Sequence, residues 1–108
     1  MTVQHLTLAK FRHGTTCEEK KEAIRTVYLM AVAALIIPGV TALKVGPPVS
    51  QKGARGYEFA LTVEFEDLQA FREYIPHPHH RLVAEYISNF SEGTPLSYQI
   101  DTSREARL

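Results

Sequence analysis

The 108-residue sequence lacks several features that large classes of protein require. It has one cysteine, Cys17, so an internal disulfide is excluded and no pair of thiols is available to hold a metal. It has no excess of either charge, because 12 basic side chains balance 12 acidic ones. Nucleic acids and anionic membrane surfaces select basic proteins, so neither is an expected partner. These absences favour a reducing compartment and a near-neutral partner.

Targeting signals and linkers are also missing. The N-terminal segment Met1-Thr2-Val3-Gln4 lacks the charged and apolar regions of a signal peptide, which favours a cytoplasmic location. The uncharged stretch from Val27 to Ile37 has eleven residues, whereas a membrane-spanning helix needs about 20. No linker divides the chain. Residues 1–108 are therefore predicted to form a single domain, with a folded part of about 3–101 and a frayed C-terminal tail.

Hydrophobic periodicity predicts four strands, at about 3–11, 40–45, 57–65 and 96–101. The third is the clearest because its residues alternate strictly between two faces. One face carries the large apolar side chains Tyr57, Phe59, Leu61, Val63 and Phe65. This alternation predicts a strand with one buried face.

Helices are predicted between these strands. Thr15, followed three residues later by Glu18, has the form of a capping box that begins a helix running to about Ile36, and Pro38-Gly39 ends it. A short helix is expected from residues 66–67 and another after Pro78. The residues that precede the two prolines of the intervening turn, 75 and 77, are expected to be extended.

The predicted order of elements is typical of the α+β class. Strand, helix, strand, strand, helix pair, strand is the ferredoxin-like βαββαβ plan with a four-stranded antiparallel sheet. This plan leaves one face of the sheet bare. Pairing that face with the same face of a second copy would bury it and enclose a cavity, so we expect a homodimer. The apolar second half of the first helix, 27–37, is likewise expected to be covered by another subunit.

The first strand offers the first candidate site, because His5, Thr7 and Ala9 share one face. Small and polar side chains fill a core poorly, but they suit the lining of a cavity. The alternative interpretation is a core histidine that is satisfied by a backbone partner.

The second candidate site is the segment His77-Pro78-His79-His80, which holds three of the five histidines. Histidine changes charge near neutral pH, so the cluster favours proton transfer. One alternative is a surface turn with solvated histidines, and another is a metal site made by all three. Adjacent and alternate residues after a proline rarely converge on one ion, and no carboxylate follows at ligand spacing, so no metal is expected.

Five segments in order resemble the stress-responsive A/B barrel domain family. They are residues 5–11, 37–40, 56–57, 65–66 and 74–80, and the resemblance extends over about Val3 to Asp101. It implies a dimeric α+β barrel. It also implies an activity, because polyketide cyclases of the olivetolic acid cyclase type in this family close a linear poly-β-keto thioester by intramolecular aldol condensation.

The resemblance implies roles for individual residues. His80 would be the base, Tyr74 would assist it, and His5 would line the site, which makes these three the candidate catalytic residues. Phe59 stands where the cyclases carry a histidine, and this departure makes the pocket more apolar. The candidate substrate-binding residues are His77, Thr7, Ala9, Phe59 and Tyr28.

An intramolecular aldol closure fits these residues chemically. It needs a base for a carbon between two carbonyls, and a donor to the oxygen that becomes an alkoxide, but no cofactor. The expected partner is a hydrophobic, polyketide-like small molecule, which a polyketide synthase would supply. The alternative is a non-catalytic stress-response dimer that binds a hydrophobic small molecule in the same cavity.

Overall fold

The computed structural model describes residues 2–102. The elements are β1 (Val3–Ala9), α1 (Cys17–Val32), the 3₁₀ helix η1 (Ala33–Ile36), β2 (Val40–Gly46), β3 (Phe59–Phe65), α2 (Leu68–Tyr74), α3 (Pro78–Phe90) and β4 (Leu96–Asp101). The four strands form one antiparallel sheet in the order β2-β3-β1-β4. This arrangement confirms the predicted ferredoxin-like α+β fold.

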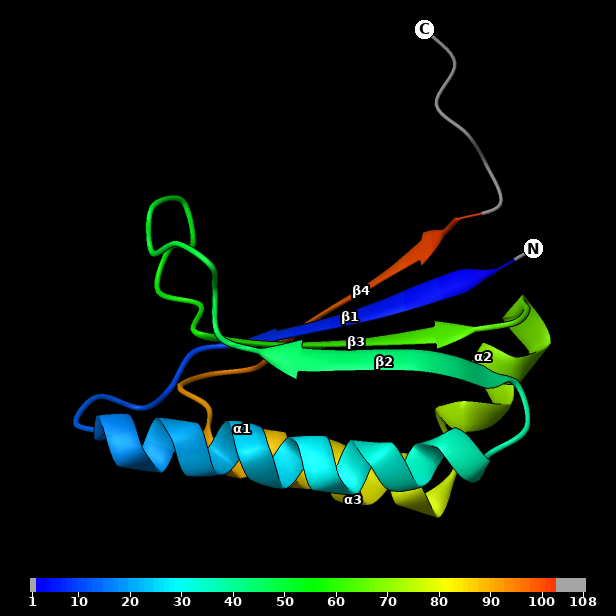
Figure 1. Ribbon diagram of the computed structural model, residues 1–108, viewed down its shortest axis with the longest axis horizontal. Helices are drawn as coiled ribbons and strands as arrows, with labels where there is room; N and C mark the ends of the chain where they lie inside the picture. Colours follow the sequence, from blue (N-terminus) through cyan, green and yellow to red (C-terminus); the bar gives the residue numbers. More distant parts are fainter. Residues whose placement is uncertain (1, 103–108) are drawn as a thin grey trace, which may run out of the picture.

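The helices cover one face of the sheet and leave the other bare. Figure 1 shows α1 and α3 side by side beneath the sheet, α2 at one end, and no helix above it. Because directly paired residues share a face, Leu6 and its partner Tyr98 lie on the bare side, as do Leu8 and Leu96. Tyr98 is 59% exposed and Leu96 is 42% exposed. The predicted bare apolar face is therefore present in the single chain.

The helix-covered side of the sheet holds the core. Phe59, Leu61, Val63 and Phe65 of β3 are all buried, as the alternation predicted. The strand begins at Phe59 rather than at residue 57. At the same end of the sheet β1 stops at Ala9, the partner of Phe59, and the expected last residue, Phe11, makes only an isolated bridge to Ser91.

The capping box of α1 lies one residue later than predicted. Thr16 is the N-cap, its hydroxyl accepts from the Glu19 N–H at 3.1 Å, and the Glu19 carboxylate accepts from the Thr16 N–H at 2.9 Å. Thr15 belongs to the preceding turn, where its hydroxyl donates to the carbonyl of Arg12 at 2.6 Å. The sequence contains two overlapping Thr-x-x-Glu motifs. Thr16 forms the capping box because the hydroxyl of Thr15 is already engaged in the preceding turn.

The helix that was expected to run to about Ile36 ends as an α-helix at Val32 and continues as η1. Gly39 follows with a φ of +91°, a conformation that favours glycine. A β-carbon at this position would lie 2.4 Å from the β-carbon of Ala70. Gly39 therefore allows α2 to approach the turn that leads into β2.

The turn between α2 and α3 only partly follows the rule for residues before proline. His77 is extended, with φ −63° and ψ 136°, and Pro78 occupies the first position of α3. Ile75 was expected to be extended but is helical, with φ −55° and ψ −46°. Its N–H donates to the carbonyl of Phe71 at 3.3 Å, so α2 continues up to the proline.

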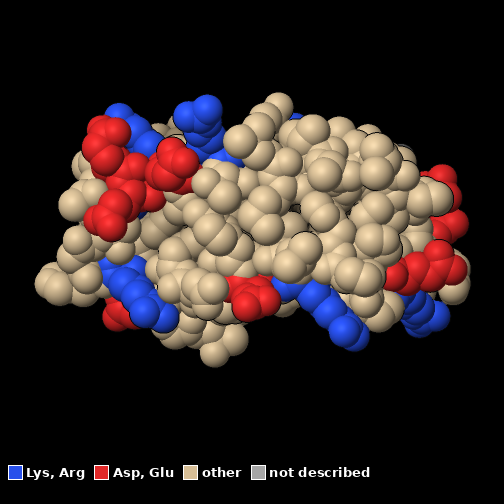
Figure 2. Space-filling view, turned by 90° about the horizontal axis from the view of Figure 1, so that it is seen from below, with Lys and Arg blue, Asp and Glu red and all other residues tan. Residues whose placement is uncertain are grey.

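The outer side of α1 is apolar and exposed in the single chain. Leu29 is 60% exposed and Ile36 is 86% exposed. Figure 2 shows a broad uncharged area on the helix side of the molecule. Since α1 lies on the opposite side of the sheet from the bare face (Figure 1), pairing the bare faces of two copies leaves this area uncovered. The sequence analysis expected a second subunit to cover both the bare face of the sheet and the apolar half of the first helix. These two surfaces cannot belong to one sheet-to-sheet interface.

Within residues 2–102, no helix is both long enough and apolar enough to cross a membrane.

Candidate active site

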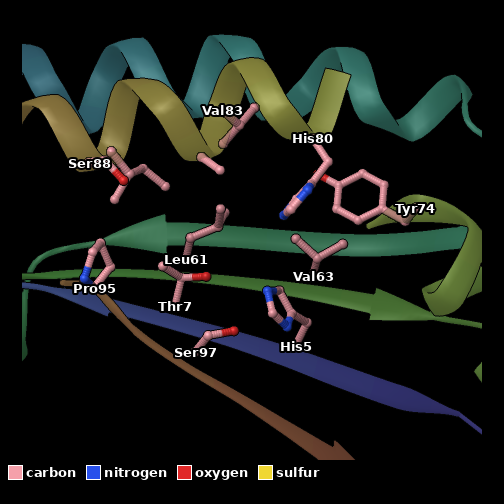
Figure 3. Close-up of a pocket in the computed structure, with 12 residues that line it drawn as sticks. His5, Thr7, Leu61, Val63, Tyr74, His80, Val83, Ser88, Pro95 and Ser97 are labelled. Atoms are coloured by element: carbon pink, nitrogen blue, oxygen red, sulfur yellow. The ribbon is translucent and has the colours of Figure 1, made fainter. Parts of the chain in front are cut away.

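A cavity of about 220 Å³ lies between the helix-covered face of the sheet and α3. Its floor is formed by side chains of β1 and β3, and its roof by Val83, Ala84 and Ile87 of α3. Figure 3 shows His5 rising from β1 toward His80, which descends from α3, with Tyr74 beside it. The cavity is thus formed within one chain. The expectation that two bare sheet faces would enclose it is wrong, because its lining residues lie on the opposite face.

His5 is buried, with 5% of its surface exposed, and it lines the cavity. Its Nδ1 lies 2.9 Å from Nε2 of Gln99, and its ring packs against Phe71 with the ring centroids 5.5 Å apart. Burial, assisted by the nearby His80, lowers the pKa of His5 from 6.5 to about 4. His5 is therefore neutral throughout the physiological range.

His80 faces His5 across the cavity, with the ring centroids 6.4 Å apart. Its Nδ1 lies 2.8 Å from the carbonyl oxygen of Ile75. A carbonyl oxygen only accepts, so Nδ1 carries the proton and the Nε2 of neutral His80 has a free electron pair. Burial lowers the pKa of His80 below its usual value, although the bond to Ile75 acts in the opposite direction. The chain therefore presents an imidazole that is ready to accept a proton.

Tyr74, the last residue of α2, is the third polar group of this cluster. Its ring lies against His80, with the centroids 5.0 Å apart, and its hydroxyl end points toward His80 in Figure 3. The side chain is 2% exposed, and this burial raises the pKa of the phenol. Tyr74 therefore keeps its proton and is a hydrogen-bond donor at the cavity wall.

The structure brings four of the predicted site residues to the cavity, namely His5, Thr7, Tyr74 and His80. Ala9 and Phe59 pair with each other in the core beyond it, and Phe59 packs against Phe90 with centroids 5.2 Å apart. Tyr28 is 50% exposed on α1. The sequence could assign each of these three residues to a strand or a helix. It could not show how far each residue lies from the cavity.

His77 and His79 are not among the residues that line the cavity, and both have structural partners. The Nδ1 of His77 accepts from the backbone N–H of His79 at 3.0 Å and caps α3. The Nε2 of His79 lies 2.6 Å from the carbonyl of Met30 in the last turn of α1. Carbonyls in the last turn of a helix lack a helical partner, so this contact joins the two helices.

The histidines of the turn do not converge on one point, because each engages a different backbone group. Within residues 2–102, no group of three or more His, Cys, Asp or Glu side chains is arranged to hold a metal ion.

Two polar residues of β4, Ser97 and Gln99, were missed by the sequence analysis. Ser97 lines the cavity, and Gln99 lies opposite His5 in the register of the β1–β4 pair. A signal for them was available, because the ferredoxin-like plan places the last strand beside the first. The residues of β4 that alternate toward the helices then adjoin His5 and Thr7.

Comparisons with known proteins agree with this fold. Residues 3–98 match the family described as the stress responsive A/B barrel domain. Olivetolic acid cyclase of Cannabis sativa is 36% identical over 81 residues, which cover 74% of this chain and 77% of that protein.

Solved structures extend the likeness to more distant proteins. A dimeric ferredoxin-like protein of unknown function from Jannaschia sp. CCS1 is similar with a TM-score of 0.79 at 16% identity, covering 94% of this chain and 99% of its own. A hydroxynitrile lyase from Passiflora edulis has a TM-score of 0.69 at 18% identity, covering 93% and 94% of the two chains. At these identities the likeness establishes the fold alone. The family match covers nearly the whole chain, from the strand of His5 to that of Gln99, and so the chain belongs to the stress-responsive A/B barrel domain family.

Proposed function

We propose that this protein is a polyketide cyclase-like enzyme, which closes a linear poly-β-keto intermediate by an intramolecular aldol reaction without a cofactor. The observation that carries the proposal is the meeting of His80, Tyr74 and His5 in one mostly apolar cavity. The similarity to olivetolic acid cyclase supports it further.

The chemistry begins at His80. Its unprotonated Nε2 removes a proton from a carbon between two carbonyl groups, which is acidic enough for an imidazole base. The resulting carbanion attacks a ketone carbon further along the same chain, and a carbon–carbon bond forms. The ketone oxygen becomes an alkoxide, and Tyr74 stabilises it by donating a hydrogen bond. The proton on His80 then passes to this oxygen, which leaves the base ready for another cycle.

The apolar wall contributes by selecting a conformation. Leu61, Val63 and Ile87 line the cavity beside the polar cluster. A flexible polyketide chain that is folded against such a wall brings its two reacting carbons together, and this positioning accounts for a large part of such rate enhancements. A volume of about 220 Å³ lies below the roughly 300–1,000 Å³ usual for sites of drug-sized ligands, and it favours a short substrate.

A homodimer is part of the proposal. The bare face exposes Leu96, Tyr98 and Ile100. The protein from Jannaschia, which has a similar fold, is described as dimeric. Burying this face against a second copy removes apolar surface from water. Sedimentation at micromolar concentration is expected to give a dimer, and Tyr98→Glu is expected to shift it toward monomer. A monomeric native protein would refute this part.

The direct test of the activity is the product profile when the protein is added to a polyketide synthase reaction, since a synthase is the enzyme class that supplies poly-β-keto thioesters. We expect a cyclised product to replace the spontaneous by-products, and the His80→Ala variant to abolish this change. If the native protein binds the intermediates but leaves the profile unaltered, the protein is the non-catalytic binding dimer instead.

A further inference from the structure

Gln99 of β4 contacts His5 of β1 across the sheet. The two residues are direct partners in the β1–β4 register, although 94 positions separate them in the chain. The side-chain nitrogen of Gln99 lies 2.9 Å from Nδ1 of His5 and 3.1 Å from Oγ of Ser97. One amide group therefore contacts both the histidine and a serine at the cavity wall.

The direction of this contact follows from the donor inventory. An amide nitrogen only donates, and its two N–H groups serve His5 and Ser97. Nδ1 of His5 must then be the acceptor and carry no proton. In a neutral imidazole the proton consequently lies on Nε2. The ring of His5 lines the cavity with Nδ1 already engaged, so its Nε2–H is left for a ligand.

His80 has the opposite tautomer. Its Nδ1 donates to the carbonyl of Ile75, so its Nε2 is an acceptor. The two rings face each other with centroids 6.4 Å apart, and Figure 3 shows both directed into the same space. The cavity thus holds one imidazole that donates and one that accepts. A β-dicarbonyl group matches this pair, because its oxygen accepts a hydrogen bond while the carbon beside it loses a proton.

We propose that Gln99 is a positioning residue that holds His5 in the Nε2–H tautomer, so that His5 donates a hydrogen bond to a carbonyl oxygen of the substrate opposite the base His80. The substrate rests on the proposed function, whereas the tautomer of His5 is a property of the free protein. Burial supports the assignment, since it keeps His5 neutral and hence able to exist as a single tautomer.

The first experiment measures the tautomers directly by nitrogen NMR of histidine-labelled protein. In the native protein we expect a pyridine-type Nδ1 and a pyrrole-type Nε2 for His5, and the reverse for His80. Gln99→Glu places an acceptor beside Nδ1 and should make that nitrogen of His5 protonated. Gln99→Met should give an averaged signal. Gln51→Met, a change of the same kind in the exposed loop before β3, serves as the control and should leave both signals unaltered.

A pyrrole-type Nδ1 of His5 in the native protein would overturn the assignment. So would a His5 signal that is unchanged by both substitutions of Gln99. Neither result depends on whether the protein is a cyclase, so a failure of this inference can be told apart from a failure of the proposed function.

The second experiment tests the donor role with a small neutral β-diketone, 2,4-heptanedione, as the probe. Titration should shift the Nε2–H signal of His5, and Gln99→Met should weaken binding by about fivefold, as expected for one lost hydrogen bond. In the cyclisation assay the same variant should raise KM by a similar factor and also lower kcat by about 10-fold, because the interaction strengthens further as charge develops on the oxygen. A probe that binds without affecting His5, with an undiminished kcat in Gln99→Met, would reject the donor role.

Discussion

The two sides of the N-terminus of α3 differ sharply, although the histidines that define them are adjacent in sequence. On the cavity side, His80 meets Tyr74 and faces His5. On the α1 side, His79 reaches the carbonyl of Met30. Successive residues of a helix point about 100° apart, so neighbours in sequence meet different surroundings. Identical side chains thus line the candidate active site on one side and join two helices on the other.

The sharpest test of this difference compares His80→Ala with His79→Ala. If His80 is the base, its loss should lower the cyclisation rate by about 10²–10⁴-fold, the usual contribution of a positioned acid or base. His79→Ala should leave the rate per folded molecule close to that of the native protein, because its partner lies in α1. Steady-state kinetics of the two variants decide the matter, and equal rates would mean that the turn is purely architectural.

The stability of the protein should depend on pH through His5, which lines the cavity. His5 has a pKa of about 4 when folded against 6.5 when unfolded, so the unfolded state binds the extra proton in between. Stability should therefore be unaffected above pH 6.5 and fall by up to about 3 kcal/mol as the pH drops toward 4. Urea unfolding across this range measures the slope. His5→Gln removes the titrating group and should flatten it, and an equal slope in the variant would contradict the assignment.

The rate of cyclisation should depend on pH through His80. Burial lowers the pKa of this residue, and the base is active only when neutral. Activity should therefore persist at pH values below the usual imidazole pKa and decline only under more acidic conditions. A profile of kcat/KM against pH tests this expectation. A decline that begins well above the usual value would point to a base other than His80.

Tyr74→Phe should have a smaller effect than His80→Ala. The variant keeps the ring that packs against His80 and Phe65 but removes the donor, so we expect kcat to fall by about 10-fold with little loss of stability. The comparison needs kcat and thermal unfolding on the same preparation. An unchanged kcat would leave Tyr74 with a packing role alone.

The smallest effect should come from the α1 side, and it should be seen in stability. His79→Ala leaves the carbonyl of Met30 without this partner and should reduce the free energy of unfolding by about 1 kcal/mol. Chemical denaturation measures the loss, and His13→Ala, in an exposed turn, is the matched control. A loss no larger than that of the control would show that the contact adds nothing to stability.

Much of the fold followed from the sequence because its signals are local. The alternation of β3 identified its buried residues Phe59 to Phe65, and a helix was expected just after Pro78, which is the first residue of α3. The shared face of His5 and Thr7 on β1 was likewise a matter of period-two geometry. Each of these patterns depends on residues within a few positions of one another, which backbone sterics and side-chain spacing control directly.

Tertiary structure decided the features that join distant residues. The contact of Gln99 with His5 across 94 positions depends on the register of β1 and β4, and that of His79 with Met30 across 49 positions depends on the packing of α3 against α1. It placed Phe59 and Tyr28 in the site, whereas packing puts one in the core and the other on the surface. The physical reason is that the twist of the sheet and the packing of the helices determine how each face is oriented. Periodicity in the sequence predicts which residues share a face. Which element or solvent that face contacts is determined only when the sheet and the helices pack together.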